Sequence, residues 1–182
     1  MKRSLLAALL CSPLSFACMT HQSEIERVYS DFRHDISKTA GAPHDDDAIK
    51  RQNERAEKVK KISDDGGLKT AQDYFDAAVI LQQTDDLDML KLAETLGLKA
   101  AEMGEDKGFR VSAEAVDKQL VRMGMAQRYG TQYIYEPVLR GWRLYPYDPR
   151  TTDEERKAMG VPPIAELIKG EDVLNQRGKP KL

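Results

Sequence analysis

Two aspartates, Asp73 and Asp117, are the residues of this chain best suited to acid–base catalysis. Each is expected on a helix, with three glutamines expected nearby: Gln82, Gln127 and Gln132. A pair of carboxylates can act as general acid and general base, as in glycoside hydrolysis. However, Asp73 stands where a helix-capping carboxylate belongs, and Asp117 could simply hold a neighbouring arginine. A hydrolase-type enzyme that uses this pair is therefore the alternative interpretation, and the favoured one is not an enzyme.

Other catalytic and metal chemistry is poorly supported. Nucleophilic Ser or Cys catalysis needs a histidine within reach, whereas all three histidines precede the expected core, and there is no Gly-rich phosphate loop, HExxH or CxxC. The run His44-Asp45-Asp46-Asp47 is better explained as a helix N-cap with first-turn anions, because adjacent carboxylates point in different directions and no second ligand cluster accompanies them. We expect no metal and no cofactor.

A binding surface is the main functional candidate, at and after Gln127–Gln132. Five of the seven tyrosines and the only tryptophan, Trp142, lie between residues 129 and 147. Rings give flat stacking faces, and amides and guanidinium groups give directional hydrogen bonds. The candidate binding residues are Gln82, Gln127, Arg128, Tyr129, Thr131, Gln132 and Trp142. For the stretch itself, the favoured interpretation is a structural corner in which these polar groups satisfy the backbone, with Gly130 supplying a positive φ or letting another backbone approach closely.

The first residues have the layout of a secretory signal peptide. A short basic start, Met1-Lys2-Arg3, precedes an apolar run over residues 5–11 that is too short to span a bilayer. Cleavage after Ala17 fits the small-x-small rule and shifts the net charge from −2 to −4, because Lys2 and Arg3 are removed. An exported, mildly acidic protein is a poor candidate for binding nucleic acid, although arginines alternate with rings near the C-terminus. We therefore expect no nucleic-acid partner.

Cys18 is the candidate lipidation site. It would be the only cysteine left after cleavage, and a lone thiol in an oxidising compartment is a liability unless something uses it. The sequence before it matches a lipoprotein signal imperfectly, since Leu14 is one position too early and Phe16 is bulky. Met19 rather than Asp after the cysteine is typical of outer-membrane retention. We expect a periplasmic protein, anchored to the outer membrane by a lipid on Cys18, or alternatively a soluble periplasmic protein.

The periodicity predicts a mainly helical domain. Residues 1–17 are the signal peptide, 18–44 an extension with one short helix and a hinge, 45–170 a single domain, and 171–182 a charged, frayed tail. Helices are expected over 46–63, from a capping-box start at Thr70 to about 83, from the capping Asp85-Asp86 to 103, and over about 107–123. Their inward positions are expected to include Ile49, Gln52, Ala56, Val59, Ile62, Tyr74, Ala77, Ala78, Leu81, Met89, Ala93, Leu96, Ala100, Met103, Phe109, Ala113, Val116, Leu120 and Met123. Short turns and small contact residues favour antiparallel helical hairpins, similar to tetratricopeptide packing but without a fixed repeat.

A β-hairpin is expected after Gly130, at about residues 131–145. Alternation around Tyr133 and Trp142 predicts two strands joined around Pro137–Gly141. Two strands alone are not stable, so the hairpin must pack on the helices. A short helix should begin at Thr152 or Asp153 and end at Gly160, followed by one or two turns over 164–168.

Three motifs in this order resemble a bacterial domain-of-unknown-function family (DUF6624-like). Residues 73–82 fit D-Y-x-x-A-A-x-x-x-Q, residues 127–132 fit Q-x-[FY]-G-T-Q, and residues 153–164 fit D-E-x-R-x-x-x-G-[LV]-P-P-[LI]. The resemblance covers about residues 47–168 and implies an exported protein, but it supplies neither a reaction nor a ligand. The chain departs from the pattern at Gln83, where His is expected, and at Lys118, where Arg is expected. If that histidine carries chemistry in relatives, this chain lacks it.

Taken together, these features favour an exported interaction or binding module of the cell envelope. Its expected partner is an envelope protein, a peptide or a glycan, and it would touch the membrane only through a lipid on Cys18.

Overall fold

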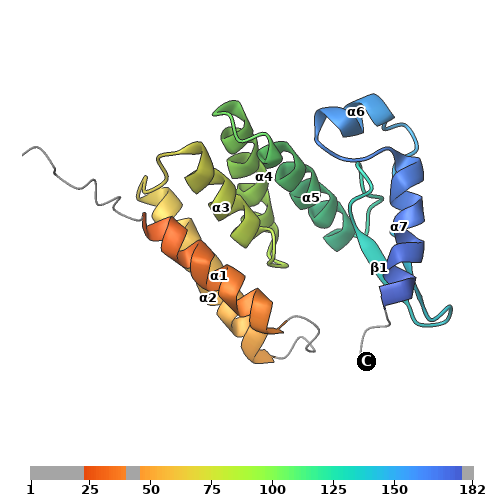
Figure 1. The fold of residues 1–182 in the computed structure, drawn as a ribbon, viewed down its shortest axis with the longest axis horizontal. Helices are drawn as coiled ribbons and strands as arrows, with labels where there is room; N and C mark the ends of the chain where they lie inside the picture. The colour runs from red at the N-terminus through yellow and green to blue at the C-terminus, as the bar shows by residue number, and fades with distance from the viewer. Residues whose placement is uncertain (1–22, 40–45, 178–182) are drawn as a thin grey trace, which may run out of the picture.

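The computed structural model describes residues 23–39 and 46–177, which are mainly helical with one small antiparallel sheet (Figure 1). The expected fold class, helical hairpins with a short C-terminal β-hairpin packed on them, is confirmed. The signal segment, Cys18 and residues 40–44 of the expected hinge lie outside the described residues. The described elements, in order, are α1 (Glu24–Thr39), α2 (Asp46–Asp64), α3 (Ala71–Leu81), α4 (Leu87–Glu102), α5 (Lys107–Arg122), β1 (Tyr133–Glu136), β2 (Gly141–Leu144), α6 (Asp153–Ala158) and α7 (Ile164–Arg177).

Helices α1 to α5 share one hydrophobic core. In Figure 1, α1 and α2 lie side by side at one end of the molecule, and α3, α4 and α5 lead from them towards α6 and α7. Burial of apolar surface between these helices is the main stabilising term. The core residues are Ile25, Val28, Phe32, Ala56, Val59, Ile62, Leu68, Ala77, Ala78, Ile80, Leu81, Met89, Ala93, Leu96, Val111 and Ala115.

Two glycines bring the backbones of α4 and α5 into contact. A Cβ atom added to Gly108 would lie 2.2 Å from the carbonyl oxygen of Gly97, and one added to Gly97 would lie 2.9 Å from the carbonyl oxygen of Gly108. Neither distance is compatible with a side chain, so this crossing requires glycine at both positions. The crossing fixes α5 against the body, and α5 in turn holds the C-terminal half of the chain.

Helix α5 buries apolar residues on two sides, whereas the sequence predicted one inward side for it. Val111 and Ala115 face the first core. Ala113 and Val116 face a second, smaller core. Met123, expected to point inward, is exposed because the helix ends at Arg122. The other members of the second core are Tyr129, Leu144, Met159, Val161, Ile164 and Leu167.

The hairpin forms as expected, within two residues of its predicted limits. Strands β1 and β2 pair antiparallel, with Tyr133 opposite Leu144 and Tyr135 opposite Trp142. The rings of Tyr135 and Trp142 meet edge to face, with centroids 5.7 Å apart. Helix α7 lies beside β2 (Figure 1), and the hydroxyl of Tyr133 donates to the Leu167 carbonyl at 2.6 Å. The hairpin therefore packs on the helices through α7 and the second core.

The helix predicted near the N-terminus is confirmed, whereas the tail predicted at the C-terminus is not. The expected frayed tail from Glu171 is wrong as far as Arg177, because α7 continues to that residue and its polar side chains bond the hairpin. The helix expected in the N-terminal extension is α1, whose Ile25, Val28 and Phe32 belong to the main core. Two other inward assignments fail: Ile49 and Met103 are exposed.

Asp76 is a buried carboxyl group that the apolar pattern of α3 did not reveal. It is 3% exposed and accepts a hydrogen bond of 2.7 Å from the Gln72 amide. Burial raises the pKa of Asp76 to about 6, and the charges of Asp73 and Glu26 add to the effect. The nearby Glu26 and Tyr29 belong to α1, so Asp76 lies where α1 docks on α3.

We predict that Asp76→Asn stabilises the fold at pH 7.5 but not at pH 4. The folded carboxyl binds its proton up to about pH 6, whereas an unfolded aspartate releases it near pH 4, so the ionised carboxyl costs stability as the pH rises between these values. Asparagine imitates the neutral form and still accepts from Gln72. Denaturant unfolding should show a gain of about 1–3 kcal/mol at pH 7.5. An equal effect at both pH values would contradict this prediction.

Candidate functional site

Asp117 on α5 organises the loop that leads to the hairpin. It has no exposed surface. One carboxylate oxygen accepts from the backbone amides of Arg128 (2.7 Å) and Tyr129 (2.8 Å). The other accepts from the backbone amide and the hydroxyl of Thr131, both at 2.9 Å. Four donors in the right geometry compensate for removing this charge from water.

Gln127 ties the same loop to the segment after β2. Its side-chain amide donates to the carbonyls of Gln132 (3.0 Å) and Tyr145 (2.8 Å), and its side-chain oxygen accepts from the Gln132 amide (2.8 Å). Its backbone pairs with Pro146 and Asp148. Gln127 is fully buried, so each of these bonds satisfies a group that water cannot reach.

Gly130 provides the turn between these two sets of bonds. Its φ of +92° favours glycine, and a Cβ atom would lie 3.0 Å from a methyl group of Leu167. The positive φ expected of this residue is confirmed, whereas its close neighbours are side-chain methyl groups and not another backbone.

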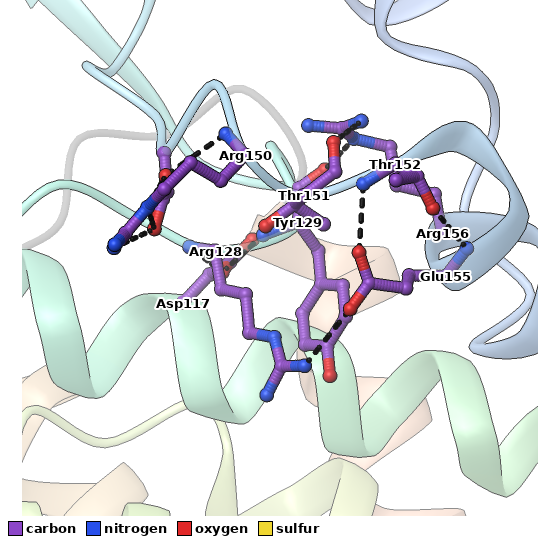
Figure 2. Close-up of polar contacts among 9 residues, drawn as sticks. Asp117, Arg128, Tyr129, Arg150, Thr151, Thr152, Glu155 and Arg156 are labelled. Atoms are coloured by element: carbon purple, nitrogen blue, oxygen red, sulfur yellow. Dashed lines mark hydrogen bonds and ion pairs between the residues drawn. The ribbon is translucent and has the colours of Figure 1, made fainter.

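Arg156 fastens α6 to the loop. Its guanidinium donates to the carbonyls of Tyr129 (3.0 Å) and Thr151 (2.7 Å) (Figure 2). It also lies over the ring of Tyr147, 5.9 Å from the ring centroid. One terminal nitrogen of Arg156 has no partner among the described residues. Asp153 bonds Arg156 and also accepts from the backbone amide of Ile164 at 2.9 Å, which links α6 to the start of α7.

The predicted binding residues near the loop differ in how far the protein itself uses them, and Gln132 also bonds Gln127. Gln127, Tyr129 and Thr131 are used by the internal bonds described above. Arg128 points outward to Glu155 (Figure 2), at 3.4 Å, with its guanidinium over the Tyr129 ring. Gln132 and Trp142 are half-buried. The structural corner is therefore real, and any binding surface must lie beside it.

Such a surface exists as a groove over the hairpin, next to α7. The groove has a volume of about 690 Å³, and its lining includes Tyr145, Pro146 and Tyr147. Apolar side chains on its walls include Ile134 and Ile168, which are 47% and 44% exposed. Its charged members are Glu136, Arg143 and Glu171. These rings and Arg143 belong to the aromatic region expected to bind, but none of the seven predicted binding residues lines the groove.

Gln82 lies near a different, polar pocket. This pocket of about 560 Å³ lies between α2, the α3–α4 turn and α5, and its lining includes Gln52, Gln83 and Lys118. Lys118 donates to the carbonyls of Gln82 and Gln83, both at 3.1 Å, and burial lowers its pKa. Gln83 and Lys118 thus meet at one place. There the Lys118 ammonium satisfies two backbone carbonyls at the C-terminal end of α3.

The two candidate catalytic carboxylates are both held by internal donors. Asp73 completes a capping box with Thr70 and also accepts from the Lys69 amide and the Ser23 hydroxyl, each at 3.0 Å. Burial alone would raise the pKa of Asp73, but the backbone hydrogen bonds outweigh it and lower the pKa. Asp117 holds backbone amides and not the guanidinium of Arg122, which pairs with Asp85. Both carboxylates therefore have structural roles.

Comparisons of the chain with protein-family models, with curated proteins and with solved structures gave no match. Within residues 23–39 and 46–177, no group of three His, Cys, Asp or Glu residues is arranged to hold a metal ion. None of the described helices is both long enough and apolar enough to cross a bilayer.

We predict that Asp117→Asn lowers the free energy of unfolding by about 2–4 kcal/mol. The asparagine keeps one acceptor oxygen, but its NH₂ group replaces the other and faces two donors, which lose their acceptor. These donors are the amide and hydroxyl of Thr131 in one orientation and the amides of Arg128 and Tyr129 in the other. Denaturant unfolding measures the loss. The matched control is Asp86→Asn, at the exposed N-cap of α4, where asparagine caps equally well and a change below about 0.5 kcal/mol is expected. Equal effects of the two substitutions would contradict a special role for Asp117.

Proposed function

We propose that the protein is an exported interaction module of the periplasm that binds a peptide or glycan of the cell envelope in the groove over the hairpin. The observation that carries this proposal is the groove itself, in which aromatic and aliphatic side chains are bordered by charges of both signs. A concave, mainly apolar surface with a few polar groups is the usual form of a binding site.

The groove is also held rigidly, which favours binding. Of its lining residues, Tyr145 and Pro146 accept hydrogen bonds from Gln127 through their backbone carbonyls. The ring of Tyr147 lies under the guanidinium of Arg156. A surface ordered before it meets its partner loses less conformational entropy on binding.

A hydrolase-type enzyme is the weaker candidate. Both of its proposed carboxylates are occupied by backbone amides and hydroxyl groups, and Asp117 is closed to solvent. A general acid or base must lie within hydrogen-bond reach of a substrate. Neither group can meet that condition without breaking the bonds that hold the fold.

We predict that the double variant Ile134→Ser with Ile168→Ser loses at least nine-tenths of the specific partner captured from envelope extract. Both side chains are exposed in the groove, so their loss removes apolar contact without opening a core. The control is Ile36→Ser with Ile49→Ser, which changes two equally exposed isoleucines, 48% and 46%, on α1 and α2. Quantitative mass spectrometry of the captured material gives the ratio. Equal capture by both double variants would contradict a site in the groove.

For localisation, we propose anchoring to the outer membrane through a lipid on Cys18, with a soluble periplasmic protein as the alternative. Cys18→Ser should abolish labelling by radioactive palmitate and release the protein into the soluble periplasmic fraction. The control is Cys11→Ser, which changes the other cysteine within the expected signal segment and should leave labelling intact. Membrane retention of the Cys18→Ser variant at the level of the unaltered chain would remove the lipid anchor from the proposal.

A further inference from the structure

The outer edge of β1 presents a row of main-chain groups that have no partner among residues 23–39 and 46–177. Tyr135 lies opposite Trp142, and Tyr133 lies opposite Leu144. The amides of Trp142 and Leu144 bond to side chains of α7 and so point away from β1. In an antiparallel pair, the main-chain amide and carbonyl of each opposing residue then also point away from the partner strand. The amides and carbonyls of Tyr133 and Tyr135 thus face outward, and no residue in the described part of the chain bonds them.

The other edge of the sheet is closed by the protein itself. Asn175 of α7 accepts from the Trp142 amide at 2.6 Å and donates to the Trp142 carbonyl at 3.0 Å, as the backbone of a neighbouring strand would. Glu171 accepts from the Leu144 amide at 3.0 Å. Among the described residues, no side chain bonds the outer main-chain groups of β1 in this way. The β2 edge of the hairpin is therefore satisfied within the protein, and the β1 edge is not.

Strand β1 has no proline, lysine or bulge within its four residues, so its protection as an exposed edge is limited to its short length and the charge of Glu136. Soluble proteins block such edges with proline, lysine, a bulge or a covering segment. The strand reads Tyr-Ile-Tyr-Glu and pairs regularly over its whole length. Within the strand Ile134 is half-exposed, and Val138 and Leu139 at the hairpin tip are 88% and 59% exposed.

We propose that an extended peptide segment of an envelope protein adds to β1 as a third, antiparallel strand. Tyr133 and Tyr135 then exchange up to four main-chain hydrogen bonds with the peptide, in the manner of other edge-binding modules. This inference rests on the proposed function and names its partner, because Ile134 and Glu136 belong both to β1 and to the groove.

The side chains of β1 specify the chemistry of the peptide. Successive residues of a strand point to opposite faces, so Ile134 and Glu136 meet peptide side chains on the groove face. The matching segment carries an apolar residue beside Ile134 and a basic residue beside Glu136, two positions apart. A second copy of this chain fits less well, since an edge of four residues buries far less than the roughly 1,200 Å² expected of a stable dimer.

The test uses the full chain and linear eight-residue peptides selected on it by display, then synthesised with a fluorophore. Tyr135→Pro removes the outward amide but leaves the β1–β2 bonds, because proline is tolerated on an edge strand. Tyr135→Ala keeps that amide and lacks the ring, so the pair isolates one N–H group. We expect fluorescence anisotropy to give a Kd at least tenfold higher for Tyr135→Pro than for Tyr135→Ala.

A second measurement does not depend on the folding of any variant. Peptides methylated at alternate backbone amides should bind in one register and lose at least tenfold in the other, because only alternate amides of an added strand face β1. Failure to select any peptide, equal binding by the two Tyr135 variants, or equal tolerance of both methylation registers would overturn the proposal. So would a dimer of the unaltered chain that Tyr135→Pro dissociates.

The failure of this inference differs from the failure of the proposed function. If the groove variants of Ile134 and Ile168 lose the peptide while Tyr135→Pro keeps it, the groove binds and edge addition is wrong. If Tyr135→Pro loses the peptide relative to Tyr135→Ala, edge addition holds.

Discussion

The C-terminal half of this protein depends on one buried carboxylate. Asp117 is closed to solvent in the middle of α5, and its charge is balanced by three backbone amides and one hydroxyl of the loop 128–131. An ionised carboxylate without such donors would be very costly in this position. The loop is therefore held in the one conformation that presents its amides to α5. Gln127 extends the constraint to the segment after β2, and Arg156 extends it to α6. A two-stranded hairpin, unstable alone, thus acquires a fixed place on a helical body.

Patterns of local interaction were readable from the sequence. The apolar spacing of α2 to α4, the capping residues Thr70 and Asp86, the stop at Gly160 and the approximate limits of the two strands all follow from rules that involve neighbours within one or two turns. What could not be read depends on packing between distant segments. The two-sided burial of α5, the buried Asp76 and the continuation of α7 to Arg177 each require knowledge of what lies opposite. The length of α7 is the clearest case, because Glu171 and Asn175 gain partners only once β2 lies beside them.

The roles of the candidate binding residues also depend on contacts between distant segments. Gln127, Tyr129 and Thr131 stood out because polar groups among rings need partners, and that reasoning was sound. The partners proved to be the protein's own backbone, so these residues build the corner and do not contact a ligand from it. The three motifs that resemble a bacterial family of unknown function supply Asp73, Gln127, Thr131, Asp153 and Arg156, all of which make internal bonds. Function is then best sought on the neighbouring surface that these bonds hold still, over the hairpin and along β1.

Hydrogen exchange tests most directly whether Asp117 and Gln127 fix the hairpin to the helical body. The account predicts that the amides of Arg128, Tyr129, Thr131 and Gln132 exchange only when the whole domain unfolds, at the rate of the amides in the centre of α4. The Leu139 amide, at the exposed hairpin tip, should exchange within seconds. Fast exchange of the loop amides while α4 stays protected would contradict the account, because the loop would then open without disturbing the helices.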